Sequence, residues 1–318
     1  MVEGSAIRII FFGTPAFAVP TLDALLQSRH PVVGVVTQPD RPHGRGQKTT
    51  DAPVKARAVA AALPILQPAS LKDDLFLRQL HGLQADLGVV AAYGRILTET
   101  VLALPPLGLI NVHASLLPRH RGAAPVHRAI IAGDRETGVT IMRIVKALDA
   151  GPMLAVASRS ISPDETSDAV ERDLARLGAQ LLVSTIDNLA HGRVNETPQD
   201  DHAATYAARL TKEDGIVDWR LPATRVHNLI RGLHPWPHAF TFLGRTRLIL
   251  LRSAPSSDMH TSEPGTILEA AADRLIVAAG EGAIHLHRIQ VEGKRAMTPR
   301  EFLAGHHLSR GDRLTAAP

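Results

Sequence analysis

The sequence contains no cysteine, and only 3% of its residues are aromatic. The first absence excludes a disulfide scaffold, a thiol nucleophile and every metal or iron–sulfur site that needs a cysteine ligand. The second means that stacking of bare bases on exposed rings is not a main activity of this chain. A chain without cysteine fits a reducing compartment, and we expect a cytoplasmic location.

Long apolar runs are missing as well. The longest uncharged stretch, residues 101–118, is interrupted by Pro105, Pro106 and several polar side chains, which a lipid-facing helix would not tolerate. The N-terminus, MVEGSAIRIIFFG, has no basic segment and only a short apolar run before Gly13. We therefore expect no membrane span, no signal peptide and no membrane partner.

The composition is otherwise that of a globular protein with two domains or one large one, because 45% of its 318 residues are apolar and 21% are charged. The net charge of +4 is unevenly placed. Residues 1–206 hold 20 basic and 20 acidic side chains, whereas residues 207–318 hold 15 and 11, a difference of 4. A basic C-terminal part suits contact with nucleic acid, although from charge alone a solvated surface is the simpler interpretation.

Apolar, strand-like runs alternate with helical patterns in the first half of the chain. The expected strands are residues 7–12, 32–37, 86–92, 109–113 and 138–145. The expected helices are residues 15–26, 52–62, 73–80, 98–104 and 124–132, with Thr14 and Asp51 as caps of the first two. Because the strand runs are apolar throughout, they predict an α/β fold with a Rossmann-like, mostly parallel sheet and helices on both faces.

The pattern changes after a long amphipathic helix expected from Thr166 to Leu189. Residues 191–209 are polar and contain glycine and proline, which is typical of a linker. Short apolar runs separated by turn residues follow, and they predict a small antiparallel, OB-like barrel. We therefore expect a first domain over residues 1–190, a linker over 191–209 and a C-terminal β-barrel domain over 210–318.

The strongest local signal is NVHASLLP, at the end of the expected strand 109–113. Asn111 and His113 are two residues apart, so on a strand their side chains point to the same face. They emerge together at the edge where parallel sheets bind ligands. An amide can stabilise a developing oxyanion and an imidazole can transfer a proton, although both residues could equally be satisfied polar groups that end a strand.

A carboxylate follows the expected strand 138–145. Asp149 lies in the turn LDAGP, also at a sheet edge. There it could orient His113 and hold the protonated ring, or it could be an ordinary turn aspartate. The sequence alone leaves both interpretations open.

The loop over residues 38–50, QPDRPHGRGQKTT, is long for a connection in an α/β unit. Arg41, Arg45 and Lys48 lie among glycines, so we expect the loop to be basic and flexible. It is either a solvated surface loop or an arm that contacts phosphates and orders on binding.

Two familiar ligand motifs are incomplete. The turn after the first strand has one glycine, Gly13, where a dinucleotide fingerprint needs three, so we expect no NAD site. The histidine pairs His285/His287 and His306/His307 lack both helical spacing and an accompanying cysteine, so we expect no metal.

Several segments together resemble the methionyl-tRNA formyltransferases, which belong to the folate-dependent formyltransferase group. They cover nearly the whole chain and are FFGTPAFAV, TQPDRPHGRG, VVAAYGRIL, INVHASLLPRHRGAAPVHRAI, GDRETGVTIMRIVKALDAGPML, YAARLTKEDGIVDW and IRGLHPWP. The run NVHASLLP followed by RGAAP and TGVTIM is the most specific. The first half alone would indicate only the wider group, whereas the second domain and the TQPDRP loop point to the family that acts on tRNA.

The resemblance implies roles for particular residues. Asn111 would hold the formyl oxygen, His113 would be the acid–base group and Asp149 would support it. Two short segments would form the walls of the folate site, namely Gly94, Arg95, Ile96 and Leu97 together with Ser115, Leu116, Leu117 and Pro118. The arm that reaches the tRNA acceptor end would carry Arg41, Arg45 and Lys48.

Two positions depart from some members of the family. Pro152 stands where some have a second aspartate, so Asp149 must act without that neighbour. His120 stands where some have tryptophan, which weakens any assignment of an aromatic wall to this position.

The implied reaction is transfer of the formyl group of 10-formyltetrahydrofolate, a co-substrate, to the methionine amino group of initiator methionyl-tRNA. A folate-binding catalytic domain and a tRNA-binding barrel would do this without a metal, and we expect a monomer. One alternative is a folate-dependent formyltransferase of small amines, such as glycinamide ribonucleotide or an amino-sugar nucleotide, which would have less use for a basic barrel and loop. Another is a tRNA-binding protein on an inactive transferase scaffold, against which the intact Asn111, His113 and Asp149 argue.

Overall fold

The computed structural model describes residues 5–40, 42–43, 48–49, 51–257 and 260–318. Its contacts divide the chain into two compact units. Unit 1 comprises Met1–Pro125, Thr137–Arg159 and Glu171–Ala207. Unit 2 comprises Val126–Glu136, Ser160–Val170 and Ala208–Pro318, so two short segments that lie between parts of unit 1 in the sequence belong to it.

Unit 1 is built on a seven-stranded sheet in the order β10-β9-β7-β6-β1-β2-β5. β1, β2, β5, β6 and β7 are mutually parallel, and β9 returns antiparallel to β7. The strands are β1 Ile9–Gly13, β2 Val32–Val36, β5 Ile65–Leu66, β6 Leu87–Ala91, β7 Leu109–His113, β9 Glu136–Arg143 and β10 Met153–Ser160. Two short pairs lie outside this sheet, β3 Pro42–His43 with β4 Lys48–Thr49, and β8 Arg121–Gly122 with β11 Tyr206–Ala207. The expected Rossmann-like, mostly parallel sheet is confirmed.

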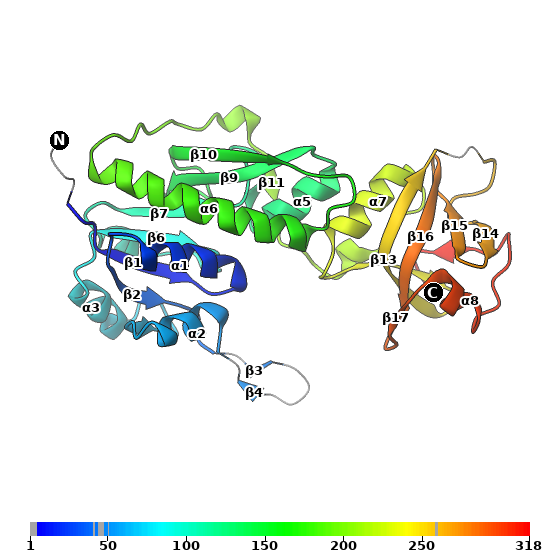
Figure 1. Cartoon of the computed structure of the whole chain (residues 1–318), viewed down its shortest axis with the longest axis horizontal. Coiled ribbons are helices and arrows are strands. Elements are labelled where there is room, and N and C mark those ends of the chain that lie inside the picture. Colours follow the sequence, from blue (N-terminus) through cyan, green and yellow to red (C-terminus); the bar gives the residue numbers. More distant parts are fainter. Residues whose placement is uncertain (1–4, 41, 44–47, 50, 258–259) are drawn as a thin grey trace. The chain divides into compact units, whose positions relative to one another are not determined.

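Helices cover both faces of this sheet (Figure 1). On one face, Phe76 of a helix packs in a buried cluster with Val90 of β6. On the other, Gly178 lies so close to β7 that an added Cβ would be 2.7 Å from Val112 Cγ1. These are opposite faces of the sheet. Asn111 of β7 pairs with Val90, so the side chains of these two residues share one face, and Val112, the next residue, points to the other. The described helices that precede β11 in the sequence are η1 Ala16–Ala18, α1 Val19–Gln27, α2 Pro53–Ala60, α3 Asp74–Gly82, α4 Glu99–Leu102, α5 Pro125–Ala132, α6 Ser167–Ala190 and η2 Asp201–Ala203.

Two of the expected helix caps are wrong. The Thr14 hydroxyl caps no helix; it donates to the carbonyl of Tyr93 at 3.2 Å and accepts from the backbone N–H of Gln38 at 3.4 Å. It therefore ties together the segments that follow β1, β2 and β6. Asp51 forms an ion pair with Lys55 at 2.8 Å, and α2 begins without a side-chain cap.

Unit 2 contains the antiparallel sheet β14-β15-β16-β13-β12-β18, with β17 beside β16. A bridge between Thr266 and Arg313, with Leu314 N donating to Gly265 O at 2.8 Å, joins the two ends of this sheet and closes it into a small barrel. This confirms the expected antiparallel barrel, whose core packs against α7, a helix that the sequence reasoning did not predict. The elements are η3 Glu213–Gly215, α7 Ala223–Gly232, β12 Ala239–Leu243, β13 Thr246–Ser256, β14 Ile267–Ala271, β15 Arg274–Ala278, β16 Ala283–Val291, β17 Ala296–Met297, α8 Pro299–Leu303 and β18 Leu314–Thr315.

Gly138 of β9 has no room for a side chain. A Cβ there would lie 2.2 Å from the carbonyl oxygen of Ala157 in β10 and 2.5 Å from Leu116 Cδ2. Because backbone would have to shift, we expect Gly138→Ala to lower the free energy of unfolding by about 1–3 kcal/mol. Urea denaturation measures this change.

The matched control is Gly82→Ala at the end of α3, where nothing lies within 4 Å of the new Cβ. Alanine favours a helix over glycine, so no loss of stability is expected there. Equal losses in the two variants would contradict the steric explanation.

Candidate active site

Strand β7 places two of the predicted side chains at the carboxyl edge of the sheet. Asn111 pairs with Val90 of β6, and His113 ends the strand opposite Thr140 of β9. Both side chains lie on one face of the strand. The Asn111 amide is half-buried, and within the described residues no protein group hydrogen-bonds to it. It is therefore available to a ligand.

The His113 ring is 5% exposed and has one nitrogen occupied. Its Nε2 lies 3.0 Å from the carbonyl oxygen of His120. A carbonyl oxygen can only accept, so Nε2 carries the proton of this bond. The basic nitrogen of the neutral ring is therefore Nδ1, which lies 3.8 Å from Asp149 Oδ2. Because this distance is longer than a hydrogen bond, Nδ1 is free to take a proton from a ligand.

Asp149 lies in the turn between β9 and β10, with a φ of 46° in the left-handed region. Its Oδ2 accepts a hydrogen bond from the backbone N–H of Gly122 at 2.8 Å. This bond aims the carboxylate toward His113, so that a negative charge faces Nδ1 of the ring. The structure thus brings together His113 and Asp149, which are distant in the sequence.

The predicted folate segment after β6 is partly exposed. Gly94 has a φ of 79°, and an added Cβ would lie 2.6 Å from a neighbouring amide nitrogen, so the position requires glycine. Ile96 is 89% exposed and offers apolar surface to a ligand, whereas Leu97 packs against the cluster under α3. Arg95 donates to the carbonyls of residues 68–69 at 2.9 and 2.8 Å, so its guanidinium secures the segment.

The second predicted folate segment follows β7 and is mostly buried. The Ser115 hydroxyl donates to a backbone carbonyl four residues along at 2.7 Å. Leu117 N donates to Thr140 Oγ1 at 3.2 Å. These bonds fix the conformation of the loop. Leu116 and Pro118 are half-buried and offer the surface that a ligand could contact.

The predicted basic arm lies largely outside the described residues. Arg41 and Arg45 are not among them, and neither is the side chain of Lys48, although β3 and β4 pair antiparallel. At the start of the loop 38–50, Asp40 forms a hydrogen-bonded ion pair with Lys55. This bond lowers the pKa of the Asp40 carboxyl and raises the pKa of the Lys55 ammonium, so both stay charged at neutral pH.

Sequence reasoning missed the groups that support Asp149. Gln199 Nε2 donates to the carbonyls of Asp149 and Gly151, both at 2.8 Å. Its Oε1 accepts from the Nε of Arg121, which is 3% exposed, at 3.0 Å. Gln199 and Arg121 are 78 residues apart, so no local motif could have indicated the contact.

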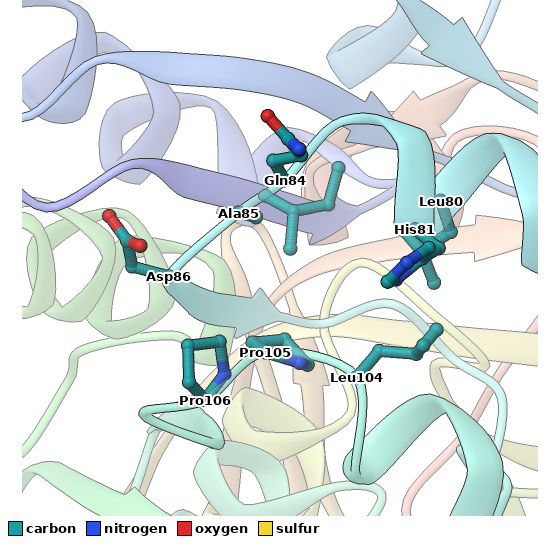
Figure 2. A pocket seen from close by; sticks show the side chains of 9 residues that line it. Leu80, His81, Gln84, Ala85, Asp86, Leu104, Pro105 and Pro106 are labelled. Carbon is teal, nitrogen blue, oxygen red and sulfur yellow. The ribbon is translucent and has the colours of Figure 1, made fainter.

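A separate hollow of about 230 Å³ lies at the other edge of the sheet (Figure 2). Its lining includes Asp86 and Pro105, from the loops that precede β6 and β7. His113 ends β7, so the length of that strand separates the hollow from the candidate active site.

Neither a metal cluster nor a spanning helix occurs in the part of the chain that the structure describes. No group of three or more His, Cys, Asp or Glu side chains there could hold a metal ion, and the rings of His285 and His287 are 6.4 Å apart. No described helix is long and apolar enough to cross a membrane.

Two formyl transferase domain families match the chain, Formyl transferase over residues 7–186 and Formyl transferase, C-terminal domain, over residues 209–307. The methionyl-tRNA formyltransferase of Trichlorobacter lovleyi is 46% identical over 304 residues, which is 96% of each chain. That of Methylococcus capsulatus is 47% identical over 307 residues, 96% of this chain and 99% of the relative.

The likeness extends to solved structures. An N-formyltransferase from Helicobacter canadensis, crystallised with folinic acid and dTDP-3-aminofucose, has a TM-score of 0.67 over 89% of this chain and 99% of its own. At 16% identity this likeness shows the fold alone. From the domain matches and the full-length relatives, the chain belongs to the formyl transferase family and, within it, to the methionyl-tRNA formyltransferases.

Proposed function

We propose that the chain transfers the formyl group of 10-formyltetrahydrofolate to the α-amino group of methionine on initiator tRNA, giving formylmethionyl-tRNA for translation initiation in the cytoplasm. One observation carries the proposal. The amide of Asn111, which has no partner among the described residues, shares a strand face with His113, and Nδ1 of His113 faces the carboxylate of Asp149. Acyl transfer to an amine needs an oxyanion donor and a base, and these residues supply both.

The chemistry follows from the hydrogen bonds of the site. Formyl-folate supplies the activated formyl carbon. The Asn111 amide donates to the formyl oxygen as that oxygen gains negative charge. His113 Nδ1 takes the proton that the attacking amine loses and returns one to the folate nitrogen as its bond to carbon breaks. Asp149 stabilises the imidazolium between these two transfers, and the proton count balances.

The folate would be held by the segments after β6 and β7. Ile96, Leu116 and Pro118 offer apolar surface for a flat ring system. The remaining predicted positions act through the backbone or by holding the loops, and they are Gly94, Arg95, Leu97, Ser115 and Leu117. Folate titration of an Ile96→Ser variant tests this assignment.

The tRNA would be held by the basic arm and by the C-terminal part of the chain, where the excess positive charge lies. In this proposal residues 1–190 form the catalytic domain, 191–209 connect it and 210–318 bind tRNA. We expect a monomer in solution, which light scattering measures directly.

Among the arm residues, Arg45 is expected to matter most. We expect Arg45→Ala to lower kcat/KM for charged initiator tRNA strongly and to reduce the salt slope by about one unit, because a phosphate contact is lost. Folate affinity should stay nearly unchanged. The measurement is kcat/KM at several salt concentrations, beside a folate titration.

Arg78→Ala, which removes the same charge from an exposed site on α3, is the control. Wild-type kinetics for Arg45→Ala would make the arm a plain surface loop. A matching loss of folate affinity would instead mean that the arm shapes the pocket.

A transferase of small amines would use the same three catalytic residues, so substrate choice needs its own assay. We expect formyl transfer to charged initiator tRNA and none to uncharged tRNA, with small amines far slower. Faster transfer to glycinamide ribonucleotide or an amino-sugar nucleotide would replace the proposal. Tight tRNA binding without any transfer would indicate a binding protein.

A further inference from the structure

The conformation of Asp149 needs support from outside its own turn. Its φ of 46° lies in a region that residues other than glycine adopt mainly when their surroundings hold them. Gly151, two residues on, is equally confined, because an added Cβ would lie 2.0 Å from the carbonyl oxygen of Arg143. The position of the carboxylate therefore depends on what secures this turn.

One side chain from a distant segment secures it. The amide nitrogen of Gln199 donates to the carbonyls on both sides of Ala150, those of Asp149 and Gly151, each at 2.8 Å. A single NH₂ group thereby spans the tip of the turn. Gln199 follows α6 and lies in the stretch that the sequence suggested was only a linker.

The oxygen of the same amide is also hydrogen-bonded, which fixes the orientation of the Gln199 side chain. Its Oε1 accepts from Arg121 Nε at 3.0 Å, and a buried Arg121 terminal nitrogen also pairs with Asp201 at 2.7 Å. The neighbouring Gly122 N–H donates to Asp149 Oδ2 at 2.8 Å. A closed ring of hydrogen bonds and main chain therefore runs through Asp149, Gly122, Arg121 and Gln199, and it includes the Asp149 carboxylate.

The segment also supports the other neighbour of His113. Thr205 Oγ1 accepts from the backbone N–H of His120 at 2.9 Å. The carbonyl of His120 is the group that accepts from His113 Nε2 at 3.0 Å. Residues 199–205 thus hold in place both the carbonyl and the carboxylate that face the catalytic ring.

We infer that Gln199 is a positioning residue for formyl transfer, which acts by holding the Asp149 carboxylate where it stabilises the His113 imidazolium. This rests on the proposed function. The described contacts of Gln199 are with Arg121, Asp149 and Gly151 and not with His113, so its effect on the ring must pass through Asp149.

The test uses Gln199→Met in the full-length protein, since methionine is similar in length but makes none of the three bonds. We expect kcat to fall about tenfold or more, with KM for charged tRNA and folate within about twofold, because misplaced catalytic groups affect the chemical step. Gln180→Met, on the exposed side of α6, is the matched control and should leave kcat unchanged.

A double-mutant cycle distinguishes positioning from general support. If Gln199 acts through Asp149, adding Gln199→Met to Asp149→Asn should lower kcat by less than about twofold further, whereas an unrelated structural effect would multiply. Gln199→Asn, which keeps the amide but is one methylene too short, replaces the methionine variant if that one unfolds, and should lose kcat similarly.

The outcomes separate the two proposals. A wild-type protein that transfers no formyl group overturns the proposed function. The inference about Gln199 alone is overturned by either of two results, provided that the wild type is active and Asp149→Asn is slow. One is a wild-type kcat in both Gln199 variants. The other is a double mutant whose loss of kcat is the full product of the two single losses.

Discussion

Replacing His113 by alanine is expected to lower kcat for formyl transfer by about 10²–10⁴-fold, because the imidazole nitrogen proposed to take the amine proton is lost. KM for charged tRNA and folate should change by less than about threefold, since the proposed proton transfers belong to the chemical step and not to substrate binding. Steady-state kinetics give both values. Added imidazole should restore part of the rate, because it can enter the vacated space and accept the proton. A variant that keeps a tenth or more of the wild-type kcat would remove the acid–base role from His113.

The chain offers a matched control in a second buried histidine with an aspartate partner. His30 is 1% exposed; its Nε2 lies 3.1 Å from Asp187 Oδ1, and its Nδ1 accepts from the backbone N–H of Ile7 at 3.0 Å. Both nitrogens are occupied, so this pair cannot exchange protons with a ligand as His113 can. We expect His30→Ala to lower the melting temperature and to leave kcat near the wild-type value.

The strands of the sheet could be predicted where they are buried on both faces. β1 and β6 are apolar throughout, and β7 is apolar except for Asn111 and His113, as expected for strands with helices on both sides. β10 was missed, since at the sheet edge its exposure alternates and its sequence, MLAVASRS, ends in polar residues. α7 was missed although Ala223, Val226 and Ile230 have helical spacing, because the segment lies among proline-rich turns.

Only the part of the site that depends on local strand geometry could be predicted from the sequence. The period of two along a strand is enough to put Asn111 and His113 on one face. Their proximity to Asp149 depends on the antiparallel return of β9 beside β7, which no local pattern specifies. The support from Gln199 comes from 50 residues further along the chain than Asp149, so it required the folded structure.

Loss of the oxyanion donor is expected to be nearly as severe as loss of the base. Asn111→Ala should lower kcat by about 10²–10³-fold, because the amide bonds to an oxygen whose charge develops only as the amine attacks. In the folded protein this amide has no partner among the described residues, so its removal leaves no protein group unsatisfied and should cost little stability. A large kinetic loss with an unchanged melting temperature is therefore the expected signature.

Two further variants test whether Asn111 is the donor to the formyl oxygen. Asn111→Asp keeps the shape but places a carboxylate against the developing oxyanion, so we expect kcat to fall at least as far as with alanine. Asn195→Ala removes an amide from an exposed site and should leave kcat unchanged. If Asn111→Asp kept more activity than Asn111→Ala, the side chain at this position would be acting as an acceptor or a base, and the formyl oxygen would need a different donor.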